Sequence, residues 1–279
     1  MGDKGICFSS ELADQATLAE NGIDGVPEMV GLPVPDVYSA ELSGFVLAAG
    51  VKIMGSRRPE IMYLSTTDYI QHKHAPGTPV ANEFYALLDR YLVQLDSLDC
   101  TIVATADHGM NAKHDEAGRP RVIYLQELLD DWLGPARVRV ILPITDPYVV
   151  HHGALGSFAT IYLPEDVDAD DLSGRLGAVS GIHYAAPGAA ACARFELPED
   201  RMGDIIAISD QHVTLGTSQD RHDLSGLDVP LRSHGGVTEQ KVPLIVNRAP
   251  ASLDAARSLR NFDIFDVALN HTQIGDGDG

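Results

Sequence analysis

Short apolar runs and longer amphipathic segments alternate through the first part of the chain. Residues 61–65 and 101–105 are nearly all apolar, which is typical of strands buried on both faces of a parallel sheet. Residues 81–98 lie between these runs with helical spacing, and residues 39–58 carry an apolar stripe of the same period. The order strand, helix, strand predicts a βαβ unit, and such units bind ligands beyond the carboxyl ends of their strands.

The pattern changes between about Arg121 and Arg221. There the apolar segments are shorter and alternate with polar residues among Gly, Pro and Asp, which predicts a smaller α+β subdomain inserted into the main fold. We therefore expect an α/β protein with a mostly parallel sheet flanked by helices and an inserted cap. The predicted parts are a core over residues 1–120, the cap over 121–225, a return to the core over 226–270, and a disordered tail over 271–279.

The charge balance excludes one class of partner. The 279 residues include 40 acidic and 20 basic side chains, which gives a net charge of −20. Nucleic-acid binding requires a basic surface, so we expect no nucleic-acid partner. A small anionic substrate must then be attracted by metal ions or by local cations, against the field of the whole protein.

The sequence also favours a cytoplasmic protein. No apolar run approaches the roughly 18 residues that span a bilayer, so no membrane partner is expected, and the first residues do not form a basic-then-apolar leader. The three cysteines have no CxxC spacing and are expected to be free, mostly buried thiols. The oligomeric state stays open, a homodimer included.

Carboxylate and imidazole side chains stand at three places that follow strand-like runs or lie in glycine-marked loops. Asp68 precedes His72 by four residues, Asp107 is next to His108, and His234 lies in a Ser-His-Gly-Gly motif. Zinc accepts this mixture of ligands, and two groups of this kind indicate two metal ions. Manganese and iron accept the same donors, so the identity of the metal stays open.

Each place also has a plainer interpretation. Taken alone, Asp68 with His72 is better explained as an exposed turn, and His234 is also open to interpretation as an ordinary loop histidine. The Asp107-His108 pair is more specific, because Gly109 behind it lets the backbone pass close to a ligand. A capping Asp beside a structural His explains that pair less well.

Further polar residues near these places are candidates for contact with an anionic substrate. They are His108, Asn111 and Lys113, of which Lys113 supplies local positive charge. His151 and His152 are open to two interpretations, as substrate contacts or as a structural pair in a turn. The remaining histidines without partner spacing are expected at the surface, and they are His114, His183, His212, His222 and His271.

With these motifs in view, the chain resembles the alkaline phosphatase superfamily and, within it, the phosphonoacetate hydrolase family. The resemblance rests mainly on Ser65-Thr66-Thr67-Asp68-Tyr69 with Gln71-His72-Lys73-His74, on Thr105-Ala106-Asp107-His108-Gly109-Met110-Asn111, and on Arg232-Ser233-His234-Gly235-Gly236. Segments 144–152 and 221–227 add to it, so that it extends to about Leu269.

The resemblance implies two zinc ions. One is expected on Asp68, His72 and His234, and the other is expected to be held partly by Asp107 and His108. A further Asp ligand, a threonine nucleophile and lysines for the substrate carboxylate lie upstream of Met1 in the family's pattern. No threonine of this chain stands in a matching motif, so we expect a core without its N-terminal strands and little activity of the chain itself.

For a complete enzyme, the resemblance implies hydrolysis of phosphonoacetate to acetate and phosphate. The reaction is expected to be an in-line displacement at phosphorus, with the metals stabilising the developing charge. One alternative is another phosphodiesterase, pyrophosphatase or phosphomutase of the superfamily. An alternative from a different class is a non-catalytic zinc-binding fragment.

Overall fold

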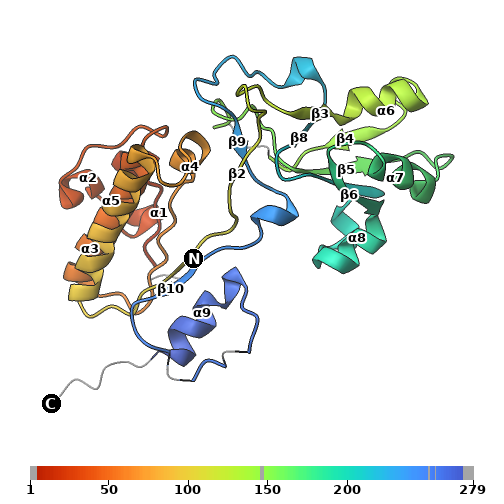
Figure 1. Cartoon of the computed structure of the whole chain (residues 1–279). Helices are drawn as coiled ribbons and strands as arrows, with labels where there is room; N and C mark the ends of the chain where they lie inside the picture. Colours follow the sequence, from red (N-terminus) through yellow and green to blue (C-terminus); the bar gives the residue numbers. More distant parts are fainter. Residues whose placement is uncertain (1–4, 145–147, 251, 255, 273–279) are drawn as a thin grey trace. The chain divides into compact units, whose positions relative to one another are not determined.

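The computed structural model describes residues 5–144, 148–250, 252–254 and 256–272, and these form two compact units (Figure 1). Unit 1 comprises Met1–Asp107 and Pro243–Gly279, and unit 2 comprises His108–Val242. The two crossings between the units thus lie at 107/108 and 242/243, whereas the predicted cap begins at 121 and ends at 225. The division into core and cap stays a prediction.

Unit 1 is mainly helical. Its core is built by η1, α2 and α3, with Phe45 and Ile53 of α3 packed against Ile23 and Val26, and α3 also packs on α5. The two long helices predicted from periodicity are confirmed, since α3 starts directly after Ser39. The elements of unit 1 are η1 (Ser10–Gln15), α1 (Leu18–Asn21), α2 (Val26–Val30), α3 (Ala40–Arg57), α4 (Tyr69–Lys73), α5 (Pro79–Ser97), β1 (Val103–Thr105), β10 (Leu244–Val246), η5 (Asn261–Asp263), α9 (Ile264–Asp266) and η6 (Val267–His271).

The strands of unit 1 differ from the prediction. Residues 61–65 form no strand, and Ile61 and Tyr63 are exposed, at 64% and 69%. Strand β1 does form within the predicted run 101–105, but it pairs antiparallel with β10. An apolar run indicates that a segment is suited to burial. It does not indicate whether the neighbouring strand runs parallel or antiparallel to it.

Unit 2 contains a four-stranded antiparallel sheet in the order β4-β5-β7-β6. A parallel pair, β3 with β8, and an antiparallel pair, β2 with β9, complete its strands within the described residues. The elements of unit 2 are β2 (Asn111–Ala112), β3 (Val122–Tyr124), α6 (Leu125–Leu133), β4 (Arg139–Ile141), β5 (Phe158–Tyr162), α7 (Ala169–Gly177), β6 (Ile182–Pro187), α8 (Gly188–Phe195), η2 (Glu199–Arg201), β7 (Ile205–Ser209), β8 (Thr214–Gly216), η3 (Gln219–Arg221), β9 (Arg232–Ser233) and η4 (Val237–Glu239).

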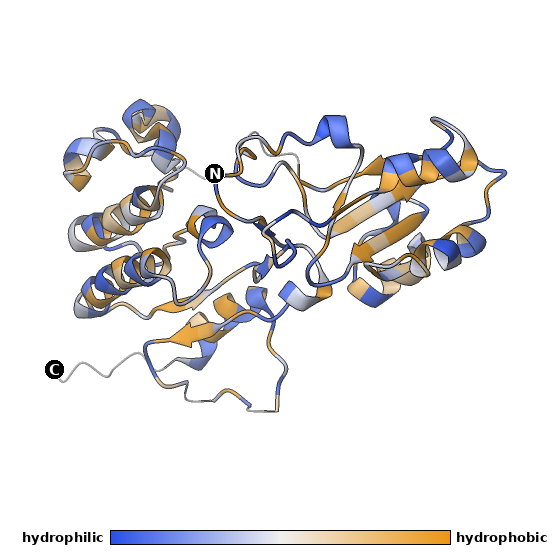
Figure 2. Ribbon diagram, turned by 45° about the horizontal axis from the view of Figure 1, so that its top comes forward, coloured by the Kyte–Doolittle hydropathy of each residue, from blue (hydrophilic) through white to orange (hydrophobic). Residues whose placement is uncertain are grey.

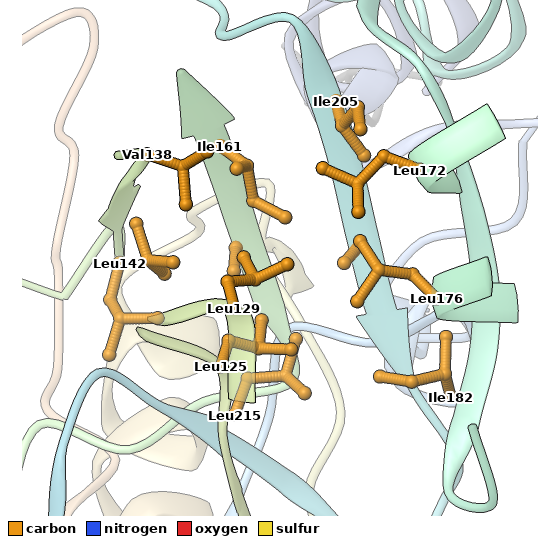
Figure 3. Packing of buried hydrophobic residues seen from close by; sticks show 13 residues of the cluster. Leu125, Leu129, Val138, Leu142, Ile161, Leu172, Leu176, Ile182, Ile205 and Leu215 are labelled. Carbon is orange, nitrogen blue, oxygen red and sulfur yellow. The ribbon is translucent and has the colours of Figure 1, made fainter. Parts of the chain in front are cut away.

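Strand β7 is buried throughout and apolar from Ile205 to Ile208, because helices cover both faces of the sheet. Successive side chains of a strand point to opposite faces. Ile205 and Ala207 accordingly join the cluster under α6 and α7, and Ile206 and Ile208 join the cluster under α8. Figure 3 shows Leu172 of α7 beside Ile205 in the first cluster. Figure 2 shows strands of this sheet in the colours of apolar residues.

The α/β class is confirmed, but the mostly parallel sheet is not. Among the strand pairs that the structure describes, β3–β8 alone is parallel. Of the predicted tail, residues 273–279 lie outside the described residues, whereas His271 ends η6 and Thr272 bridges to Pro250.

The described residues also allow a comparison with what the sequence predicted for membrane spans and for cysteines. None of its helices combines the length and the apolar character required to cross a bilayer. All three cysteines are free, as predicted, but Cys192 alone is buried, while Cys7 is exposed and Cys100 is partly exposed.

Candidate metal-dependent active site

Asp68 and His72 meet because a short helix separates them. Asp68 is the N-cap residue of α4, and a spacing of four residues places both side chains on one face of a helical turn. His72 Nε2 lies 3.1 Å from Asp68 Oδ2, and His72 is buried at 2% exposure. The sequence predicted a loop here, so the pairing was expected and the helix that produces it was not.

Asp107 and His108 follow β1, and the next residue passes another backbone closely. The amide of Gly109 donates a hydrogen bond to the carbonyl of Glu239 at 2.6 Å. A Cβ atom at position 109 would lie 3.3 Å from that carbonyl oxygen, so glycine suits this approach. The close approach predicted at Gly109 is therefore real, and the backbone of Glu239 makes it, while the predicted approach to a ligand stays a prediction.

His108 and His234 are brought together by the short pair β2–β9. Asn111 is paired with Ser233 in this ladder, which places the residues just before Asn111 next to those just after Ser233. The two imidazole rings are stacked with centroids 3.5 Å apart and planes 7° apart. His108 Nδ1 also lies 3.0 Å from the carbonyl oxygen of Gly109.

These contacts are compatible with the predicted binding of metal ions by the carboxylate and imidazole groups. When Nδ1 of His108 donates to the Gly109 carbonyl, Nε2 keeps a lone pair for a metal, which is the usual arrangement of a ligating histidine. Asp68 and His72 offer a carboxylate and an imidazole side by side. Within unit 1 the structure joins Asp68 to His72, and within unit 2 it joins His108 to His234. A common site for the two groups stays a prediction.

Two of the predicted substrate contacts have other roles in the structure. Lys113 is fully buried, and its Nζ donates to Ser157 Oγ at 2.7 Å, to the Gln211 carbonyl at 2.8 Å and to Glu239 Oε1 at 3.1 Å. An ammonium group has three donors, so all are used within unit 2. Asn111 likewise donates to Glu239 Oε1 and accepts from Gln211 Nε2. The burial and bonds of Lys113 do not agree with a direct contact between its ammonium group and a substrate, whereas the contact predicted for Asn111 stays a prediction.

Glu239 is a buried residue near the predicted motifs that the sequence did not single out. It is 2% exposed and accepts hydrogen bonds from Asn111, Lys113, Thr238 and the amide of Gly236. Burial raises the pKa of Glu239, but the bond from Asn111 and the charge of Lys113 outweigh burial and leave it below its usual value. Burial lowers the pKa of Lys113, and Glu239 offsets only part of that effect. The motif Gly236-x-x-Glu239 resembles a capping box, which was the available signal.

Another histidine departs from the prediction. His222 was expected at the surface but is buried, with Nδ1 2.8 Å from the Gly153 carbonyl and Nε2 accepting from the Thr217 amide. It is thus a structural histidine with both ring nitrogens engaged. His151 and His152 are buried neighbours whose rings meet edge to face at 4.5 Å, and their two interpretations stay open.

Comparison with solved structures gives a close match to phosphonoacetate hydrolase from Sinorhizobium meliloti 1021, in crystals with phosphonoacetate and with phosphonoformate. The identity is 60%, the TM-score is 0.91, and the match covers 96% of this chain and 65% of that one. The chain thus spans about two thirds of the length of this relative. A human ectonucleotide pyrophosphatase/phosphodiesterase 5, at 17% identity and a TM-score of 0.52 over 85% of this chain and 59% of that one, shares the fold.

Comparison by sequence leads to the same group of proteins. A phosphonoacetate hydrolase from Penicillium oxalicum is 51% identical over 49 residues, which are 16% of this chain and 68% of that protein. The family model for type I phosphodiesterase / nucleotide pyrophosphatase matches residues 45–236, a range that includes all five predicted metal ligands. These matches confirm the resemblance to phosphonoacetate hydrolases. The chain belongs to the type I phosphodiesterase / nucleotide pyrophosphatase family, within the alkaline phosphatase superfamily.

Proposed function

We propose that this protein hydrolyses the carbon–phosphorus bond of phosphonoacetate, with acetate and phosphate as products. The observation that carries the proposal is the 60% identity, over 96% of this chain, to a phosphonoacetate hydrolase crystallised with phosphonoacetate. Identity at this level over nearly the whole chain supports a shared site and not only a shared fold.

The proposed metal site uses the five residues named from the sequence. Asp68, His72 and His234 would hold one zinc ion, and Asp107 and His108 would contribute to the second. When bound, two such ions supply positive charge that stabilises the phosphoryl oxygens as they gain charge during displacement.

The protein's own part in this chemistry is to hold the ligands in orientation. His72 is buried against Asp68, and the Gly109 carbonyl fixes the ring of His108. Since all three donors of the buried Lys113 are used inside unit 2, we do not assign this side chain to the substrate, and we retain Asn111 as a candidate contact. In a protein of net charge −20, the cations at the proposed site would be the main attraction for an anionic organophosphonate.

We also place the protein in the cytoplasm. Its three cysteines are free thiols, which suits a reducing compartment.

A second candidate function is hydrolysis of a phosphodiester or pyrophosphate. It is favoured by one observation, the match of residues 45–236 to the type I phosphodiesterase / nucleotide pyrophosphatase family model.

Binding to the zinc-loaded chain separates the two candidates. No threonine of this chain is assigned as the nucleophile, so binding is the first readout and phosphate release the second. We expect isothermal titration to show phosphonoacetate binding at least about tenfold more tightly than a nitrophenyl phosphodiester or a phosphomonoester, a difference of about 1.4 kcal/mol. Preference for the diester would support the second candidate. Zinc binding without binding of any of the three would support a non-catalytic zinc-binding fragment.

A further inference from the structure

A buried ion pair in unit 2 is formed by residues five positions after each of the stacked histidines, Lys113 after His108 and Glu239 after His234. The carboxylate of Glu239 accepts from Lys113 Nζ at 3.1 Å, and both side chains are at most 1% exposed. An ion pair removed from water is a costly way to stabilise a fold, because apolar side chains of the same volume often serve as well or better. The position of the pair is therefore more informative than its contribution to stability.

The two oxygens of Glu239 join the segments that follow the two histidines. Oε2 accepts from the amide of Gly236 at 2.6 Å, two residues after His234. Oε1 accepts from Asn111 and Lys113, three and five residues after His108. The carboxylate of Glu239 is thus hydrogen-bonded to both segments.

Lys113 adds a second connection to the His234 segment. Its Nζ donates to Ser157 Oγ at 2.7 Å, and the amide of Ser157 donates to the carbonyl of His234 at 2.8 Å. The His234 backbone is therefore held through Ser157 from one side and through Gly236 from the other. Both connections lead back to the same buried ion pair.

We propose that Glu239, together with Lys113, is a positioning residue that fixes the stacked arrangement of His108 and His234. The carboxylate acts on the two rings indirectly, through its bonds to Gly236, Asn111 and Lys113. The consequence for metal binding rests on the proposed function, whereas the effect on the two rings does not.

The test is the variant Glu239→Gln, with Glu127→Gln as the matched control. Glu127 also anchors a loop by accepting from a backbone amide, that of Gln219, at 2.6 Å. The readout is the NMR signals of the His108 and His234 rings in metal-free protein, assigned with His108→Gln and His234→Gln. We expect Glu239→Gln to move both signals toward those of unstacked histidine while the methyl signals of the Leu125 and Leu129 core stay in place. Glu127→Gln is expected to leave both ring signals unchanged.

A double variant keeps the test decisive if Glu239→Gln unfolds unit 2. Glu239→Gln with Lys113→Met removes both buried charges and is expected to restore folding without restoring the ring signals. Recovery of the stacked signals in the double variant would overturn the proposal, as would unchanged signals in folded Glu239→Gln.

Zinc affinity gives a second and independent readout. By competition with a chelator, Glu239→Gln is expected to bind zinc about 10- to 100-fold more weakly than the parent protein, the range for partners that orient metal ligands. A parent protein that binds no zinc would refute the proposed function, and the ring signals would still test the role of Glu239.

Discussion

The imidazole rings of His108 and His234 lie face to face, with centroids 3.5 Å apart, in unit 2 of the structure. They come from segments far apart in the sequence that the ladder β2–β9 places side by side. Neither ring is fully buried, so both remain accessible for binding chemistry. A change at His234 should therefore affect binding chemistry at the paired rings.

Replacing His234 by glutamine should remove one proposed zinc ligand while leaving unit 2 folded. We expect zinc affinity to fall by more than about 100-fold, beyond the usual effect of losing an outer-shell partner, and bound zinc to fall from two equivalents to one. Chelator competition and metal analysis measure this. His212→Gln is the control, because His212 is exposed and its Nδ1 lies 2.9 Å from the Ala112 carbonyl oxygen. Equal affinity in both variants would remove His234 from the site.

Replacing Gly235 by alanine should disturb the same histidine through the backbone. Gly235 has φ of 101°, and a Cβ there would lie 3.3 Å from the Ser157 amide nitrogen. We expect a loss of about 1–3 kcal/mol in the free energy of unfolding from the strained backbone, together with weaker zinc binding. Gly77→Ala is matched in backbone strain, with φ of 87°, but has nothing within 4 Å. It should lose stability and keep zinc affinity.

The apolar core under α6 should respond strongly to a cavity. Leu129 is fully buried in the cluster that also packs against Trp132, the single tryptophan of the chain. Leu129→Ala is expected to lower the free energy of unfolding of unit 2 by about 2–5 kcal/mol, measured by tryptophan fluorescence in urea. Asp131→Ala changes an exposed position of the same helix and should stay within about 0.5 kcal/mol of the parent. A similar loss in both variants would contradict the proposed core.

The end of unit 1 should lose stability in acid. Hydrogen bonds from Asn270 and Arg257 lower the pKa of Asp266 from 3.8 to about 2. Because the folded value lies below the unfolded value, this contribution is complete above about pH 4 and is lost as the pH falls to about 2. Hydrogen exchange of the η6 amides, corrected for the intrinsic rate, should show less protection over that interval. Asp266→Asn should abolish the dependence, and Asp89→Asn, at an exposed position of α5, should retain it.

Local patterns in the sequence predicted a substantial part of this protein. The helical period identified α3 and α5 to within about two residues. The spacing of Asp68 and His72 predicted that the two side chains could meet, and they do. Motifs of a few residues were also sufficient for the resemblance to phosphonoacetate hydrolases, which the comparison at 60% identity confirms. Such features depend on neighbours within one or two turns of chain, so a linear sequence contains them.

Long-range pairing was decided by the tertiary structure alone. The run 101–105 predicted a strand, but its antiparallel partner β10 is separated from it by the whole of unit 2. The positive charge of Lys113 and its place near the motifs predicted an anion-binding residue. In the structure Lys113 is buried against Glu239, which no strong sequence pattern identified. Whether a charged side chain faces solvent or a buried partner depends on contacts between distant segments, and those contacts exist only once the chain has folded.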